Sequence, residues 1–192
     1  RIVVSGSCAE YDWGFSNYLE ESTPLNPNTL YGVCKHSLQS MLSSYASLRE
    51  LSFAWGRIFS IYGPREHSKR LFASVIQALL HGETVTCNNG GLTRDYLHVS
   101  DVASAFVTLL KSDVQGPINI GSGSGKRLKY IIEKIEKNIG NYGYLRFDEQ
   151  LNTSSEPPII IANTKRLTGI GWMPIYNIDT GLDDTIEWFK AN

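Results

Sequence analysis

Short runs of apolar and β-branched residues alternate along the chain with longer segments whose apolar residues repeat at helical spacing. Several of the short runs end in small or turn-forming residues, which is typical of buried strands. The pattern predicts strands over residues 1–5, 51–61, 84–87, 96–99, 117–120 and 144–147. It predicts helices over residues 29–48, 69–81, 127–139 and 180–190, and a further helix that Ser100 and Asp101 cap.

The helix over residues 29–48 has the clearest periodicity. Its apolar positions follow the i, i+3, i+4, i+7 spacing of an amphipathic helix: Leu30, Val33, Cys34, Leu38, Met41, Leu42, Tyr45 and Leu48. This helix lies between two predicted buried strands, and that order is typical of a parallel crossover. Because strands and helices alternate through the rest of the chain, the sequence predicts an α/β fold.

The composition is that of an ordinary globular protein, with 192 residues, 42% of them apolar. A net charge of -1 without a long run of like charge argues against a nucleic-acid partner. No apolar run reaches the roughly 18 residues of a membrane span, and the start lacks a signal peptide, so we expect no membrane partner and a cytoplasmic location. Cys8, Cys34 and Cys87 form no Cys-x-x-Cys pair, so no metal site is expected.

A glycine-rich segment at residues 120–127 (IGSGSGKR) lies between a predicted strand and a predicted helix. Glycine loops in that position hold phosphates in nucleotide-binding proteins. The spacing matches neither the P-loop nor the dinucleotide fingerprint, because Ile120, Lys126 and Arg127 stand where those motifs need other residues. We interpret the segment as a tight turn, with a phosphate cradle as the alternative.

Tyr31 and Lys35 are the first candidates for chemistry. They lie four residues apart on the predicted helix and therefore share one of its faces. An ammonium close to a phenol favours the phenolate, which suits a tyrosine for acid-base work at neutral pH. Ser7, just after the first strand, could hydrogen-bond the same substrate oxygen. A surface pair that arises by chance is the alternative interpretation.

Four segments look like sequence motifs of the extended short-chain dehydrogenase/reductase family and occur in the same order. The chain therefore resembles this family. The four segments are residues 4–11 (VSGSCAEY), 30–35 (LYGVCK), 56–64 (GRIFSIYGP) and 94–102 (RDYLHVSDV). Residues 119–121 (NIG) and 171–174 (GWMP) fit its later strand and C-terminal turn. The resemblance covers the whole chain but only the second half of the family's usual length. We therefore expect that the domain begins upstream and that activity requires the glycine-rich half found there in the family.

The resemblance implies a Rossmann-like, doubly wound parallel sheet with a small C-terminal α/β substrate domain. Residues 1–64 would be part of the NAD(P)-binding domain, and residues 65–192 mainly the nucleotide-sugar-binding region, with 117–121 returning to the Rossmann sheet. Tyr31 would be the acid-base tyrosine, Lys35 would hold the nicotinamide ribose, and Ser7 would orient the sugar hydroxyl or ketone. Arg94 would contact the nucleotide diphosphate, with an ordinary ion pair to Asp95 as the alternative. A homodimer is expected.

Departures from the family pattern reduce the number of reactions that the resemblance allows. The family's 4,6-dehydratases carry Asp and Glu where this chain has Cys8 and Ala9, which argues against dehydration. Ser60 stands beside the substrate where Asn is common, and Thr153 stands where a phosphate-binding Arg is often found. The sequence therefore predicts an NAD- or NADP-dependent nucleotide-sugar epimerase or 4-ketosugar reductase. The rival hypothesis is a non-catalytic binding or oligomerising remnant of such an enzyme.

Overall fold

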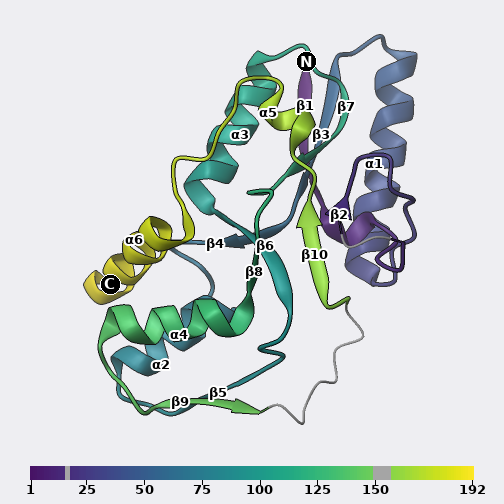
Figure 1. Cartoon of the computed structure of the whole chain (residues 1–192). Coiled ribbons are helices and arrows are strands. Elements are labelled where there is room, and N and C mark those ends of the chain that lie inside the picture. Colours follow the sequence, from purple (N-terminus) through teal and green to yellow (C-terminus); the bar gives the residue numbers. More distant parts are fainter. Residues whose placement is uncertain (16–17, 149–156) are drawn as a thin grey trace.

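The computed structural model describes residues 1–15, 18–148 and 157–192 (Figure 1). Its first sheet has three parallel strands in the order β1 (Ile2–Ser7), β3 (Phe53–Ile58) and β7 (Gly116–Ile120). Two helices connect and cover these strands, α1 (Leu30–Leu48) and α3 (Val99–Lys111). The α/β architecture and the parallel sheet expected from the sequence are confirmed.

The first sheet is buried on both faces because alternate side chains of each strand meet a different helix. Val4 and Trp55 pack with Ala46 of α1, whereas Val3 and Ile118 belong to the cluster that contains Val102, Ala105 and Leu109 of α3. Figure 1 shows the two helices on opposite sides of the strands. This arrangement is the doubly wound, Rossmann-like form.

The predicted strand over residues 51–61 is wrong in one respect, because the structure divides it into two strands. β3 ends at Ile58, and β4 (Ser60–Tyr62) pairs with a different sheet after a break at Phe59. The backbone N–H of Phe59 still donates to the carbonyl of Ile120, so the break lies just beyond the first sheet. A largely apolar run carries no sign of such a change of sheet, because the pattern does not show which strand each segment pairs with.

The second sheet has the order β2 (Tyr18–Leu19), β10 (Ile159–Ala162), β6 (Thr93–His98) and β4, and all these pairs are parallel. β8 (Gly125–Arg127) pairs antiparallel with β6, and β5 (Val85–Asn88) pairs with β9 (Leu145–Asp148) in a separate two-stranded sheet. The sequence pattern had indicated neither β2, β8 and β10 nor the short helices η1 (Cys8–Glu10) and α5 (Lys165–Thr168).

A second core lies among α2 (Leu71–Leu80), α4 (Leu128–Ile139) and α6 (Ile178–Ala191), which pack against one another in Figure 1. Its buried side chains include apolar residues at helical spacing: Phe72, Ile76, Leu79, Ile131, Ile135, Leu182 and Ile186. The predicted N-cap of α3 is corrected, because His98 and not Ser100 or Asp101 caps it: His98 Nδ1 accepts from the Ser100 N–H at 3.4 Å. Within the described ranges, no helix is long and apolar enough to cross a membrane.

Candidate active site

Ser7 lies at the carboxyl end of β1, the edge of a doubly wound sheet where ligands bind. It is buried and caps η1, with its hydroxyl oxygen accepting from the Ala9 N–H at 3.2 Å. Because this bond uses the oxygen as an acceptor, the hydroxyl proton can be donated to a ligand.

The first turn of α1 packs directly against η1. Thr29 caps the helix by accepting from the Gly32 N–H at 3.1 Å. A Cβ at Gly32 would lie 2.3 Å from the carbonyl oxygen of Ala9, so only glycine allows this approach. Gly32 therefore allows α1, which carries Tyr31, to lie against η1, which Ser7 caps.

Lys35 ties α1 to the first strand. Its ammonium donates to the backbone carbonyl of Ser5 at 2.9 Å and lies 6.0 Å from the centre of the Tyr31 ring. The Tyr31 side chain is 57% exposed, so its hydroxyl is accessible to a ligand. The structure thus brings the predicted residues Ser7, Tyr31 and Lys35 to one end of the first sheet.

The spacing of Tyr31 and Lys35 occurs a second time, which the sequence analysis had overlooked. Tyr130 and Lys134 are four residues apart on α4, with the ammonium 5.9 Å from the ring centre. Lys134 forms an ion pair with Asp179 of α6, away from the first sheet. Spacing alone therefore does not identify the site; the contact with β1 does.

The predicted substrate residues Ser60 and Arg94 line one pocket of about 360 Å³. They come from the neighbouring strands β4 and β6, and β4 directly follows β3 of the first sheet. Arg94 is buried, and its Nη1 donates to the carbonyls of Thr93 at 2.9 Å and Pro158 at 3.4 Å. Thr153, the other position at which the phosphate contact was considered, lies outside the described residues.

Two further basic residues line this pocket, Lys69 and Arg70. Glu66 lies beside them, 3.8 Å from Arg70, and accepts from the Ala73 N–H at 3.2 Å. Burial raises the pKa of Glu66, opposed by these two contacts. The sequence could have pointed to Lys69 and Arg70. Positive residues just before a helix interact unfavourably with its dipole, so their presence there suggests a role other than helix stability.

Asp95 binds the glycine-rich segment and not the neighbouring arginine. Its carboxylate accepts from the Ser122 N–H at 2.7 Å, the Gly123 N–H at 2.9 Å and the Ala162 N–H at 3.1 Å. Burial raises the pKa of Asp95, whereas these hydrogen bonds lower it. Since Asp95 occupies the amides that would hold a phosphate, the tight-turn interpretation accounts for this segment.

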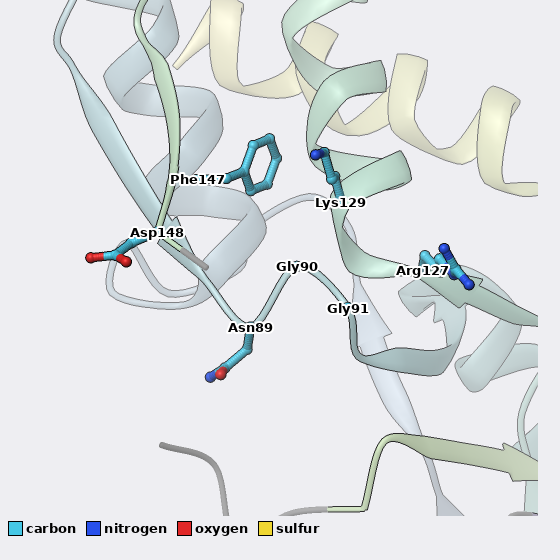
Figure 2. A pocket seen from close by; sticks show the side chains of 7 residues that line it. All are labelled: Asn89, Gly90, Gly91, Arg127, Lys129, Phe147 and Asp148. Atoms are coloured by element: carbon cyan, nitrogen blue, oxygen red, sulfur yellow. The ribbon is translucent and has the colours of Figure 1, made fainter. Parts of the chain in front are cut away.

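A second pocket of about 360 Å³ lies beside the β5–β9 pair (Figure 2). Its lining side chains include Arg127, Phe147 and Lys129, whose ammonium lies 5.0 Å from the centre of the Phe147 ring. None of the residues predicted from the sequence lines it. Among the described residues, no group of three or more His, Cys, Asp or Glu side chains could hold a metal ion.

The fold and the tyrosine–lysine pair at the carboxyl end of its parallel sheet define the class of extended short-chain dehydrogenases/reductases. The model of the NAD dependent epimerase/dehydratase family matches residues 1–121, more than half of the chain. The chain therefore belongs to this family, whose members include nucleotide-sugar epimerases and dehydratases.

Curated relatives are distant in sequence. The chain is 28% identical over 186 residues to UDP-glucuronic acid decarboxylase 1 of Xenopus tropicalis, covering 95% of this chain and 42% of that protein. It is 27% identical to a putative UDP-glucose 4-epimerase of Methanocaldococcus jannaschii, covering 99% of this chain and 63% of that protein. The chain thus spans about half the length of such relatives.

Solved structures agree on the fold. The UDP-N-acetylglucosamine 4-epimerase of Methanobrevibacter ruminantium superposes with a TM-score of 0.90 at 24% identity, covering 98% of this chain and 62% of that one. The dTDP-glucose 4,6-dehydratase of Bacillus anthracis, in complex with NAD, gives a TM-score of 0.88 at 25% identity, covering 99% and 61%.

Proposed function

We propose that the protein containing this chain is an NAD(P)-dependent nucleotide-sugar epimerase or 4-ketosugar reductase in which Tyr31 transfers the proton. The observation that carries the proposal is the position of Lys35, bonded to Ser5 of β1 and beside the ring of Tyr31. The pair lies where ligands bind a doubly wound sheet, and Ser7 ends the same strand. A non-catalytic remnant would place no demand on this arrangement.

The residues present fit the nicotinamide end of a dinucleotide site. Lys35 uses one of its three ammonium protons on Ser5, which leaves donors for a ribose hydroxyl. Tyr31 is exposed beside it, and these two residues would hold the nicotinamide ribose. When bound, the nicotinamide supplies the acceptor and donor of hydride. Tyr31 takes the proton of the sugar hydroxyl or returns it to the ketone, and Ser7 orients that oxygen by a hydrogen bond.

The residues around Ser7 favour epimerisation or ketone reduction over dehydration. Water loss from a sugar needs an acid and a base at its carbons, and Cys8 and Ala9 supply neither. Glu10 is the carboxylate nearest in sequence, but it is fully buried and bonded to Arg57 and Trp55. Hydride transfer with a bound nicotinamide would require from the protein only the roles proposed for Ser7, Tyr31 and Lys35.

The substrate part of the proposal places the diphosphate of a nucleotide sugar in the pocket of Ser60 and Arg94. Arg94, Lys69 and Arg70 give that pocket its positive charge, and a guanidinium binds phosphate oxygens in a bidentate way. On this proposal residues 1–64 serve the cofactor, and residues 65–192 serve mainly the substrate.

The homodimer is part of the same proposal. Helix α1 exposes large apolar side chains, among them Met41 at 69% and Leu48 at 79%. Contiguous apolar surface on a helix favours burial against a partner. A second copy of the protein is the proposed occupant of this surface.

The test is conversion of nucleotide sugars by the full-length protein. UDP-glucose, UDP-glucuronic acid and dTDP-glucose are incubated with NAD, and 4-keto nucleotide sugars are incubated with NADH or NADPH. Chromatography and NMR then identify the product. We expect a C4 epimer from a sugar or a C4 alcohol from a keto sugar, with no 4-keto-6-deoxy product. Failure of the full-length protein to convert any of these sugars contradicts the proposal.

A further inference from the structure

Glu10, Arg57 and Trp55 form a buried, hydrogen-bonded group next to Ser7. Glu10 has no exposed surface and Arg57 is 1% exposed, and Arg57 Nε donates to Glu10 Oε2 at 3.0 Å. Trp55 Nε1 donates to both carboxylate oxygens, at 2.9 and 3.0 Å. Arg57 also lies over the ring of Tyr11, 4.7 Å from its centre. Glu10 and Arg57 are far apart in sequence and are joined only by the fold.

The carboxylate of Glu10 also binds the backbone of Ser7. The Ser7 N–H donates to Glu10 Oε1 at 2.7 Å, and the Ser7 hydroxyl accepts from the Ala9 N–H. These reciprocal bonds form a capping box around η1. The orientation of the Ser7 hydroxyl is therefore linked to the position of Glu10, which Arg57 and Trp55 of β3 fix in turn.

The neighbouring glycine supports the same interpretation. A Cβ at Gly6 would lie 2.1 Å from Trp55 Nε1 and 2.7 Å from Glu10 Oε1. The strand that ends in Ser7 thus lies directly against the Trp55–Glu10 hydrogen bond. Burying an ion pair costs desolvation energy that an apolar pair of similar volume would avoid, so stability alone is a weak reason for it.

We infer that Glu10 is a positioning residue for the proposed reaction, which holds the Ser7 hydroxyl in its productive orientation through the Ser7 amide. The inference rests on the proposed function. Arg57 and Trp55 act through Glu10, and no atom of the three needs to touch substrate. The network also continues beyond the ion pair, since the Tyr11 hydroxyl donates to Asn119 of β7 at 2.7 Å.

The first test is a double-mutant cycle in the full-length protein, with the nucleotide sugar it converts. Glu10→Gln replaces one acceptor oxygen by an NH₂ group that faces N–H donors, and so disturbs the Ser7 anchor. We expect kcat to fall about tenfold with KM little changed, because a small misplacement of a reacting group is costly. In a Ser7→Ala background the same substitution should change kcat less than about twofold. Equal losses in both backgrounds would overturn the inference.

The second readout does not depend on turnover. Hydrogen exchange of the Ser7 amide should be about tenfold faster or more in Glu10→Gln, because its acceptor is displaced. Asp101→Asn is the matched control: Asp101 is equally buried and accepts from the Ile175 and Tyr176 amides, yet it lies outside this network. That control should leave Ser7 exchange unchanged. Unchanged exchange in Glu10→Gln would also overturn the inference.

A paired variant covers the case in which Glu10→Gln does not fold. Glu10→Met with Arg57→Met removes both buried charges and keeps an apolar volume. We expect this double variant to fold. With Ser7 unchanged, its kcat should be about tenfold below that of the wild type. Normal kcat in the folded double variant would mean that the ion pair is structural only. Absence of turnover in the wild type would instead remove the proposed function, and the positioning role with it.

Discussion

At the scale of single residues, surroundings and not spacing distinguish the candidate site. Tyr31 with Lys35 and Tyr130 with Lys134 have the same helical spacing and similar ring-to-ammonium distances. Only the first pair contacts the first sheet, where Lys35 reaches Ser5. The sequence favoured Tyr31 and Lys35 because the segments around Ser7 and Tyr31 together resemble the family.

Arg94 provides a prediction at this scale. If its guanidinium binds the diphosphate in a bidentate way, Arg94→Lys keeps the charge but loses the fork. We expect the affinity for UDP, measured by calorimetry on the full-length protein, to fall about tenfold, equivalent to one lost charge-assisted hydrogen bond. Arg127→Lys, in the pocket of Figure 2, is the control and should bind normally. Equal affinity of Arg94→Lys and wild type would contradict the role.

Glu10 shows what the sequence could not predict at this scale. A single acidic residue after Ser7, Cys8 and Ala9 looks like part of a polar turn. Its partner Arg57 lies on β3, and no sequence periodicity relates it to Glu10, because the two residues meet only through the parallel pairing of β1 with β3. Trp55 is fully buried, and it also donates to Glu10.

At the scale of elements, hydrophobic periodicity predicted the long helices and the strands of the first sheet. The short strands at the boundary between the two sheets were harder to predict from the sequence. β10 is four residues long and follows two prolines, yet it lies between β2 and β6 in the second sheet. β4 was merged with β3 because both are apolar. The strands near the pocket of Ser60 and Arg94 were therefore among the elements predicted least well.

His98 contacts both α3 and α6, and its contribution to stability depends on pH. It caps α3, lies 4.1 Å from the ring of Tyr176 between centroids, and its Nε2 is 3.3 Å from Asp184 of α6. Burial lowers the pKa of His98, against the opposing effect of Asp184 and Asp101. As pH falls below about 6.5, the unfolded chain therefore binds the proton before the folded one does, and stability is lost toward the lower folded pKa.

The corresponding prediction compares the wild type with His98→Asn, whose amide oxygen can still cap α3. Between pH 7.5 and 5, the wild type should lose its stability advantage over the variant by up to about 1.4 kcal/mol per pH unit. Urea unfolding at a series of pH values measures this difference. An advantage that is constant or that grows on acidification would contradict the account.

At the scale of the whole molecule, the two sheets meet where β3 passes into β4 at Phe59. Ser7 ends the first strand of the first sheet, with Tyr31 and Lys35 beside it on α1, and the positively charged pocket begins on the second sheet. This division matches a reaction in which one part of the protein holds the cofactor and the other holds the nucleotide sugar. The general fold followed from the sequence, whereas the path between the sheets required the structure.

The most direct test of the central claim is the turnover of Tyr31→Phe in the full-length protein, with Tyr130→Phe as the matched control. Removing one hydroxyl from the proposed site should lower kcat by about 100-fold or more, the contribution typical of general acid-base catalysis. The control removes the same group from the pair on α4 and should leave kcat unchanged. Near-normal turnover of a folded Tyr31→Phe protein would contradict the account, because the proton would then be transferred elsewhere.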